Sequence, residues 1–155
     1  MKKAEEGKAA PKFVGKDQNG KDVSLESYKG KKLIVYFYPQ DNTPTCTVES
    51  CNLRDNYKEL KKKGFEVIGI SADSMKKHQN FIRKFDLPFD LIADTELEII
   101  KSFGVWGEKT TFGKTYDGIH RTTFIIDEDG RVIKRIDDVK SKEHAQQILD
   151  ELNMN

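Results

Sequence analysis

The segment Leu33–Tyr38 is the feature of the sequence that most constrains the fold. Its six residues, Leu-Ile-Val-Tyr-Phe-Tyr, are all apolar or aromatic, without a charged or small polar residue among them. A strand with one face in water alternates polar and apolar residues, whereas an unbroken apolar run is typical of a strand buried on both faces. The sequence therefore predicts a central, partly parallel sheet that is covered on both sides.

The segments around this strand predict the layers that cover it. An N-terminal β-hairpin is expected from two short apolar runs joined through Asn19-Gly20, in a type I′ turn, and Asp127–Gly130 predicts a second hairpin. Apolar periodicity and capping residues predict further strands at 65–70, 90–92, 122–126 and 132–136, and helices at 43–63, 74–85, 96–103 and 141–152. This order predicts an α/β fold with a central mixed β-sheet flanked by helices.

Length and composition predict one domain. The 155 residues, of which 36% are hydrophobic, suffice for a core without disulfide bonds. Although the mean hydropathy is -0.70, polar residues are interleaved with apolar runs, as in a folded protein. No break in composition divides the chain, so residues 1–155 are interpreted as a single domain, with residues 1–10 as a flexible N-terminal segment.

The charge balance predicts no nucleic-acid or membrane partner. Lys and Arg number 27 against 26 Asp and Glu, which leaves a net charge of +1. The densest basic run, Lys61–Lys63, precedes Gly64, an arrangement typical of a helix C-terminus. The N-terminus has no apolar stretch of the signal-peptide type, so we expect a cytoplasmic protein.

Two cysteines in a reducing compartment point to chemistry rather than to a structural disulfide. Thr43 and Pro44 have the residue types of a helix start, which places Cys46 in the first turn. There the positive end of the helix dipole favours the thiolate, the nucleophilic form of cysteine. A nearby cation would favour it further, and Arg54 and Arg121 are both candidates.

The spacing of Cys46 and Cys51 links a bond between them to a change of shape. Five residues of α-helix rise about 7.5 Å and turn roughly 140°, which separates the two Cα atoms by roughly 8.7 Å. A disulfide does not close beyond about 7 Å without backbone movement. If Cys46 and Cys51 bond to each other, the helix between them has to unwind.

Structural interpretations exist for each of these residues. A cysteine is more often a small buried apolar residue than a nucleophile, and Thr43 is a candidate helix cap. Arg121 is also compatible with a strand-edge arginine paired with Asp127 or Glu128. Zinc is disfavoured, because His78, His120 and His144 fall on different expected elements. The aromatic residues Phe103, Trp106 and Phe112 are interpreted as packing residues of the core or of loops.

The segment Pro39–Cys46 resembles the Pro-x-x-x-Thr-x-x-Cys signature of the peroxiredoxins. Cys46–Cys51 resembles the Cys-x-x-x-x-Cys helix of the peroxiredoxin Q, or bacterioferritin comigratory protein, subfamily. The resemblance covers nearly the whole chain, from Gly7–Phe13 to the strand Arg121–Asp127. One departure is Thr45, where the family usually has Gly; helical backbone angles there do not require Gly, so activity is expected to persist.

The resemblance implies a thioredoxin-like fold and a thiol peroxidase that acts on hydrogen peroxide and organic hydroperoxides. Cys46 would be the peroxidatic cysteine and Cys51 the resolving one, forming an intramolecular disulfide that a thioredoxin-type dithiol reduces. The other implied active-site residues are Pro39, which would shield the thiolate, Thr43, which would hold the peroxide, Arg121, which would stabilise the thiolate and the peroxide, and Glu49.

The resemblance implies no metal, haem or flavin, and a monomer or weak homodimer. Two other function classes are compatible with a pair of cysteines. A protein thiol–disulfide oxidoreductase is disfavoured because no Cys-x-x-Cys is present. A non-enzymatic redox sensor or holdase would use the same change of helix shape without turnover.

Overall fold

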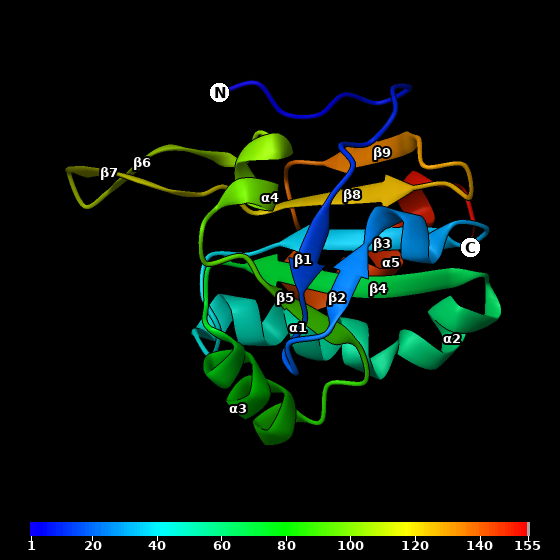
Figure 1. Cartoon of the computed structure of the whole chain (residues 1–155), viewed down its shortest axis with the longest axis horizontal. Coiled ribbons are helices and arrows are strands. Elements are labelled where there is room, and N and C mark those ends of the chain that lie inside the picture. Colours follow the sequence, from blue (N-terminus) through cyan, green and yellow to red (C-terminus); the bar gives the residue numbers. More distant parts are fainter. Residues whose placement is uncertain (155) are drawn as a thin grey trace.

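Strand β3 (Lys32–Phe37) is the centre of a five-stranded mixed sheet (Figure 1). The computed structural model describes residues 1–154. The strand order is β5-β4-β3-β8-β9, in which β3 is parallel to β4 and antiparallel to β8. The other strands of the sheet are β4 (Phe65–Ser71), β5 (Asp90–Ala93), β8 (Thr122–Ile126) and β9 (Val132–Ile136).

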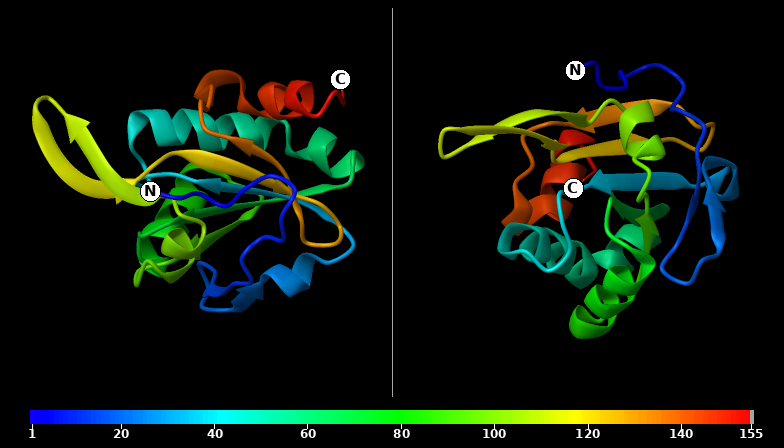
Figure 2. Two further views of the ribbon diagram at one scale, coloured as in Figure 1. Left: turned by 90° about the horizontal axis from the view of Figure 1, so that it is seen from above. Right: turned by 60° about the vertical axis from the view of Figure 1, so that its left-hand side comes forward.

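Alternate residues of β3 contribute to two separate cores, as the apolar run predicted. Ile34 and Tyr36 belong to a cluster that the helices cover, whereas Val35 and Phe37 belong to one closed by the N-terminal hairpin and α4. Figure 2 shows α1 and α5 on one side of the sheet and the β1–β2 hairpin on the other. The helices are α1 (Pro44–Asp55), α2 (Tyr57–Lys62), α3 (Met75–Phe85), α4 (Glu98–Ser102) and α5 (His144–Glu151).

The N-terminal hairpin is present, but its turn differs from the prediction. It consists of β1 (Val14–Lys16) and β2 (Asp22–Ser24), and is followed by a 3₁₀ turn, η1 (Leu25–Tyr28). Gly20 has a positive φ of 79°, but Asn19 does not, so the expected type I′ turn is wrong. The Gly20 N–H bonds to the carbonyl oxygen of Asp17 instead, as in a longer loop in which one residue is left-handed.

A second two-stranded hairpin, β6 (Trp106–Thr111) and β7 (Lys114–Ile119), was not predicted. It projects away from the sheet (Figure 1). Its tip has positive φ at both Phe112 and Gly113, the pattern of a type I′ turn. Phenylalanine is not typical of such a turn, which explains why this hairpin was not predicted from the sequence. Phe112 is 100% exposed, so its interpretation as a packing residue is wrong.

Three predicted helices differ in extent. The helix expected over 43–63 divides at Asn56, whose side-chain amide bonds the carbonyl oxygen of Asn52 and competes with the helix ladder. The helix expected over 96–103 is shorter, because Leu97 has a left-handed backbone. Ser141 begins a 3₁₀ turn, η2 (Ser141–Glu143), and α5 starts only at His144.

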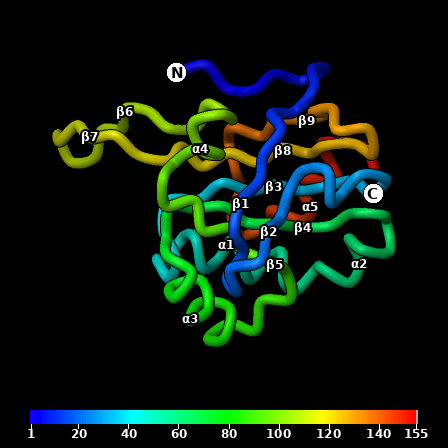
Figure 3. Tube along the Cα trace, viewed as in Figure 1, coloured from blue at the N-terminus to red at the C-terminus, as the bar shows by residue number. Residues whose placement is uncertain are grey.

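The first ten residues lie beside β9 (Figure 3). The Gly7 N–H donates to the carbonyl oxygen of Val132, and Lys3 forms an ion pair with Asp137. The mobility expected of this segment remains a prediction. Across residues 1–154, no helix combines the length and the apolar character needed to cross a bilayer.

Gly69 in β4 allows the sheet to hold helix α1 in place. The ring of Tyr36 lies over Gly69, and its hydroxyl forms a buried hydrogen bond of 2.9 Å with Ser50 of α1. A Cβ atom at position 69 would come within 2.8 Å of the Tyr36 ring and of the Leu91 side chain. Glycine at this position therefore leaves room for the ring that links β3 to α1.

We expect Gly69→Ala to lower the free energy of unfolding by about 1–3 kcal/mol, the usual cost of overpacking a core. Urea denaturation measures this. Thr110→Ala, on the exposed part of β6, is the control and is expected to change stability by less than about 0.5 kcal/mol. Equal stabilities of the two variants would contradict the close packing at Gly69.

Candidate active site

Cys46 lies in the first turn of α1, as predicted. The helix begins at Pro44, with Thr43 extended at the cap position, so Cys46 is the third helical residue. Its side chain is buried, with 1% of the residue exposed. Thr45 has no positive φ and is exposed, so this backbone does not require the glycine usual at that position.

The Thr43 hydroxyl does not cap the helix. It donates a hydrogen bond of 3.0 Å to the carbonyl oxygen of Gln40, and forms no cap bond with α1. The interpretation of its side chain as a helix cap is therefore wrong. The first N–H groups of α1, which lack partners within the helix, therefore receive no capping bond from this side chain.

Arg121, rather than Arg54, provides the cation beside Cys46. Thr122 pairs with Phe37 in the antiparallel β3–β8 register, so Arg121 lies at the end of the sheet from which the loop to α1 departs. Its Nη2 donates to Cys46 Sγ over 3.2 Å. Arg54 is bonded instead to Asp55 and to the carbonyl oxygen of Phe85.

The same guanidinium holds a second acidic side chain. Its Nη1 donates to Glu49 Oε1 over 2.5 Å, so Arg121 bridges Cys46 and Glu49. Burial tends to lower the pKa of Arg121, but the neighbouring carboxylate and sulfur outweigh burial and leave the pKa raised. Arg121 therefore pairs with Glu49. The alternative interpretation, in which Arg121 pairs with Asp127 or Glu128 at a strand edge, is wrong.

Glu49 is fully buried, and half of its carboxyl group has no hydrogen bond. Among residues 1–154, its Oε2 is the one buried side-chain oxygen or nitrogen atom without a hydrogen-bond partner. Burial raises the pKa of Glu49 to about 7, against the opposing effect of Arg121. His144 Nε2 lies 3.6 Å from Oε2.

His144, on α5, extends the site into the interior. The residue is fully buried, and burial lowers the pKa of its imidazole to about 4. Its Nε2 is 2.7 Å from the hydroxyl oxygen of Thr123, and its Nδ1 is 2.9 Å from Oε1 of Gln147. No sequence pattern predicted these contacts, because His144 follows Glu49 by 95 positions and lies in another element.

Cys51 lies further along the same uninterrupted helix. It is half-buried, both cysteines are free thiols, and burial raises the pKa of Cys51 against the opposing effect of Arg54. Because α1 is continuous from Pro44 to Asp55, a bond between the cysteines requires the helix to open.

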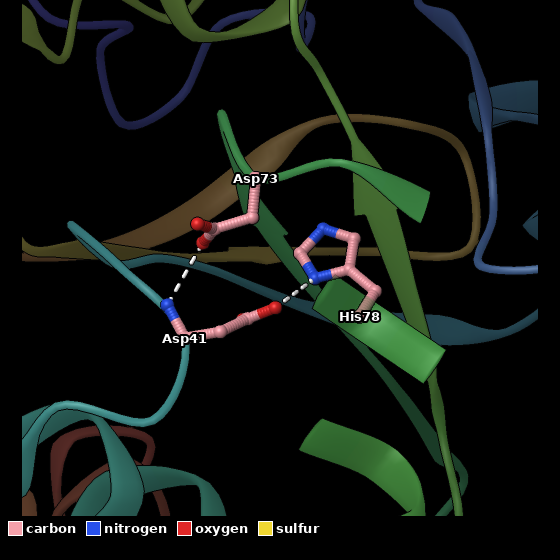
Figure 4. A group of neighbouring side chains, drawn as sticks. All are labelled: Asp41, Asp73 and His78. Carbon is pink, nitrogen blue, oxygen red and sulfur yellow. Dashed lines mark hydrogen bonds and ion pairs between the residues drawn. The ribbon is translucent and has the colours of Figure 1, made fainter. Parts of the chain in front are cut away.

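A buried hydrogen-bond network anchors the loop that precedes α1 (Figure 4). The Asp41 carboxylate accepts from the Tyr38 hydroxyl and lies 2.6 Å from His78 Nδ1, while the Asp41 N–H donates to Asp73. His78 Nε2 donates to the carbonyl oxygen of Ile92. Asp41, Asp73 and His78 have the residue types of a metal site. Both ring nitrogens of His78 are nevertheless engaged by protein atoms, so the group fits a loop anchor.

Comparison with known proteins identifies the family of the chain. Residues 7–135 match the AhpC/TSA family. Peroxiredoxin Bcp of Escherichia coli is 48% identical over 143 residues, which cover 92% of each chain. Peroxiredoxin Bcp of Bacillus subtilis is 44% identical over 146 residues, covering 94% of this chain and 93% of that protein. The chain belongs to the AhpC/TSA family.

Solved structures place it with the peroxiredoxins of the Bcp and peroxiredoxin Q type. A structure of Xanthomonas campestris peroxiredoxin Q is 34% identical, covers 91% of this chain and 89% of its own, and has a TM-score of 0.85. Peroxidoxin BcpB of Mycobacterium tuberculosis is 30% identical, covers 99% and 97% of the two chains, and has a TM-score of 0.82. The thioredoxin-like fold that the resemblance implied is confirmed.

The buried Glu49 and His144 predict two opposite pH effects on the stability of this peroxiredoxin. The pKa of Glu49 is raised by folding, so the free energy of unfolding falls as pH rises from 4.5 to about 7. The pKa of His144 is lowered by folding, so the free energy of unfolding rises as pH increases from about 4 to 6.5. Each effect amounts to about 3 kcal/mol, so they largely cancel in the parent.

Replacing either Glu49 or His144 is expected to reveal the effect of the other residue on the pH dependence of stability. Relative to the parent, stability of Glu49→Gln is expected to rise with pH over this range, and stability of His144→Gln to fall. Urea denaturation at a series of pH values measures both slopes. Glu96→Gln, at an exposed glutamate, is the control and is expected to keep the slope of the parent. If Glu49→Gln and His144→Gln also kept the slope of the parent, the shifted pKa values of Glu49 and His144 would be contradicted.

Proposed function

We propose that this peroxiredoxin reduces hydroperoxides through the thiolate of Cys46. The supporting observation is the contact of Arg121 with Cys46 Sγ at the start of a helix, because guanidinium and helix dipole both favour the anion. The thiolate attacks one oxygen of the O–O bond, which gives a sulfenic acid at Cys46 and releases water or an alcohol.

The neighbouring residues have complementary proposed roles. Thr43 would direct its hydroxyl to the peroxide, supported by its position at the start of the helix that carries Cys46 and by its lack of a capping bond. Pro39, half-buried before the loop, would limit access of bulk water to the thiolate. Arg121 would also stabilise the peroxide oxygens, while Glu49 would orient Arg121 through their ion pair.

Cys51 is proposed as the resolving cysteine. Its thiol condenses with the sulfenic acid, forms the Cys46–Cys51 disulfide and releases water. The sulfur atoms meet only after α1 opens, so the disulfide form has a locally unfolded helix that is accessible to a reductant. A thioredoxin-type dithiol then restores both thiols by exchange.

Hydrogen peroxide and organic hydroperoxides are the proposed substrates. One solved relative, the bacterioferritin comigratory protein of Xanthomonas campestris, is described by its alkyl peroxide reduction activity. The chemistry needs no metal, haem or flavin. The near-neutral charge supports the absence of nucleic-acid or membrane partners, and a monomer or weak homodimer is proposed.

We further propose a single domain over residues 1–155 and a cytoplasmic location. One central sheet with a core on each face supports the first proposal. The second is supported by the pair of free thiols, since a cycle that depends on a dithiol reductant suits a reducing compartment.

Peroxide turnover on the parent and two variants tests this mechanism, with thioredoxin, its reductase and NADPH as the reducing system. Cys46→Ser is expected to abolish peroxide-dependent NADPH loss. Cys51→Ser is expected to lose turnover with thioredoxin but to keep it with a small thiol, because its sulfenic acid still forms. No turnover by the folded, reduced parent would contradict the proposal.

The same reagents separate the other function classes. A protein thiol–disulfide oxidoreductase would reduce insulin disulfides and leave peroxide unchanged. A redox sensor or holdase would form the disulfide and bind partners on oxidation, with negligible turnover. Either outcome would replace the peroxidase mechanism.

A further inference from the structure

Asn52, the residue directly after Cys51, connects helix α1 to the C-terminal part of the chain. Its Nδ2 donates to the carbonyl oxygen of Lys142, in η2, over 2.9 Å. Its Oδ1 accepts from the N–H of Ala145, in α5, over 2.8 Å. Because one partner only accepts and the other only donates, a single orientation of the amide satisfies both. Both ends of this side chain are thus held by one neighbouring segment.

The bond to Ala145 supplies a cap that α5 does not provide for itself. The first N–H groups of a helix have no partners within the helix. Glu143, at the cap position of α5, forms no side-chain bond with these groups. The Asn52 oxygen therefore acts as a capping acceptor from another helix, and the contact stabilises α5 as well as α1.

This contact resists the movement that a Cys46–Cys51 disulfide requires. In an intact helix the two Cα atoms are roughly 8.7 Å apart, so they have to approach by about 2 Å before the bond closes. Consecutive Cα atoms lie only about 3.8 Å apart, and a shift of Cys51 is therefore passed to Asn52. Hydrogen bonds weaken beyond about 3.2 Å, so the two bonds of Asn52 do not survive a displacement of this size.

Burial indicates that Cys51, rather than Cys46, is the residue that moves. Cys46 is 1% exposed and is bonded to Arg121, whereas Cys51 and Asn52 are half-buried. Displacement of a half-buried turn exposes less apolar surface than displacement of a fully buried one. The resolving step is therefore expected to open α1 around Cys51.

Another polar contact in the same stretch of α1 is less easily broken. Ser50, directly before Cys51, is bonded to the Tyr36 hydroxyl, and both residues are fully buried. Opening there would leave buried hydroxyl groups without partners, which is costly. Water can replace the bonds of the half-buried Asn52 once they break. Opening on the Asn52 side thus has the lower cost.

We propose that Asn52 is a positioning residue of the resolving step. Its bonds to Lys142 and Ala145 hold Cys51 away from Cys46, and both bonds break before the disulfide closes. The inference rests on the peroxidase function proposed above and deepens it, because it assigns the restraint that controls when Cys51 reacts. It also implies that α5 loses its cap in the disulfide form.

The restraint acts on a competition between two reactions of the Cys46 sulfenic acid. Once Asn52 is released, the Cys51 sulfur attacks the Cys46 sulfur. The S–S bond forms as the S–O bond breaks, and the hydroxyl group leaves with the thiol proton as water. While the bonds of Asn52 hold, a second hydroperoxide can instead transfer an oxygen to the sulfenic acid, which gives a sulfinic acid and water or an alcohol.

Single-turnover kinetics test the proposal in the reduced parent and in Asn52→Ala. Each protein is mixed with hydrogen peroxide, and quenched samples are analysed for sulfenic acid by dimedone labelling and for disulfide by mass spectrometry. Asn52→Ala is expected to leave the oxidation of Cys46 unchanged. Its disulfide is expected to form about five- to thirtyfold faster, as for the loss of one or two hydrogen bonds, and with less sulfinic acid.

Two further variants separate this role from a general loss of stability. Asn80→Ala, the same replacement at an exposed position of α3, is the matched control and is expected to behave as the parent. Asn52→Asp keeps the acceptor for Ala145 but loses the donor to Lys142. Its disulfide is expected to form faster than in the parent and more slowly than in Asn52→Ala. If Asn52→Ala fails to fold, Asn52→Asp alone provides the comparison.

Hydrogen exchange at the Ala145 amide tests the structural consequence without a rate of turnover. In the reduced parent this N–H is bonded to Asn52. Exchange is expected to be at least about fivefold faster in the disulfide form of the parent and in reduced Asn52→Ala, because the bond is absent in both. Reduced Asn80→Ala is expected to match the reduced parent.

The outcomes distinguish this inference from the proposed function. Disulfide formation in the folded Asn52 variants that is no faster than in the parent would overturn the restraint. Equal exchange of the Ala145 amide in the reduced and disulfide forms of the parent would also overturn it. Both results leave the peroxidase function intact. Absence of the Cys46 sulfenic acid or of the disulfide in the parent would instead contradict the proposed function itself.

Discussion

The contact of Arg121 with Cys46 and Glu49 is the interaction on which the rest of the site depends. A half-buried guanidinium between a sulfur and a carboxylate is stable only when its partners are placed to satisfy it. The antiparallel register of β3 and β8 places Arg121, and the start of α1 places Cys46 and Glu49 on one helix face. The sheet thus contributes the cation, and the helix contributes both of its partners.

Buried hydrogen bonds hold the surroundings of this contact on the sheet side. Tyr36 links the sheet to Ser50 of α1, and Asp41 fastens the preceding loop to His78 of α3. These buried hydrogen bonds fix where α1 starts, whereas Cys51 is half-buried further along the helix. The arrangement fits a helix whose first turn stays in place for attack on peroxide and whose continuation opens when the disulfide forms.

The sequence predicted what depends on local pattern. The apolar run Leu33–Tyr38 indicated a sheet with two covered faces, and Thr43-Pro44 indicated the helix start that positions Cys46. It left Arg54 and Arg121 as alternatives, because the choice depends on a strand register that only the folded chain fixes. The resemblance to peroxiredoxins favoured Arg121, and the structure gives the physical reason.

Contacts between distant segments could not be predicted from the sequence. His144 of α5 lies close to Glu49 of α1, and no sequence pattern around either residue predicts this contact. The hairpin of β6 and β7 was missed for a local reason, because Phe112 occupies a left-handed turn position that usually belongs to Asn, Asp or Gly.

The rate at which hydrogen peroxide oxidises Cys46 in a single turnover tests the role of Arg121 most directly. Quenched-flow labelling of the sulfenic acid measures it in Cys51→Ser protein carrying either Arg121→Gln or Arg54→Gln, once both variants are shown to be folded. The account predicts at least about a tenfold slower reaction for Arg121→Gln, as expected for loss of a hydrogen bond to a charged group, and an almost unchanged rate for Arg54→Gln. Equal rates in the two variants, or a slower reaction in Arg54→Gln, would contradict it.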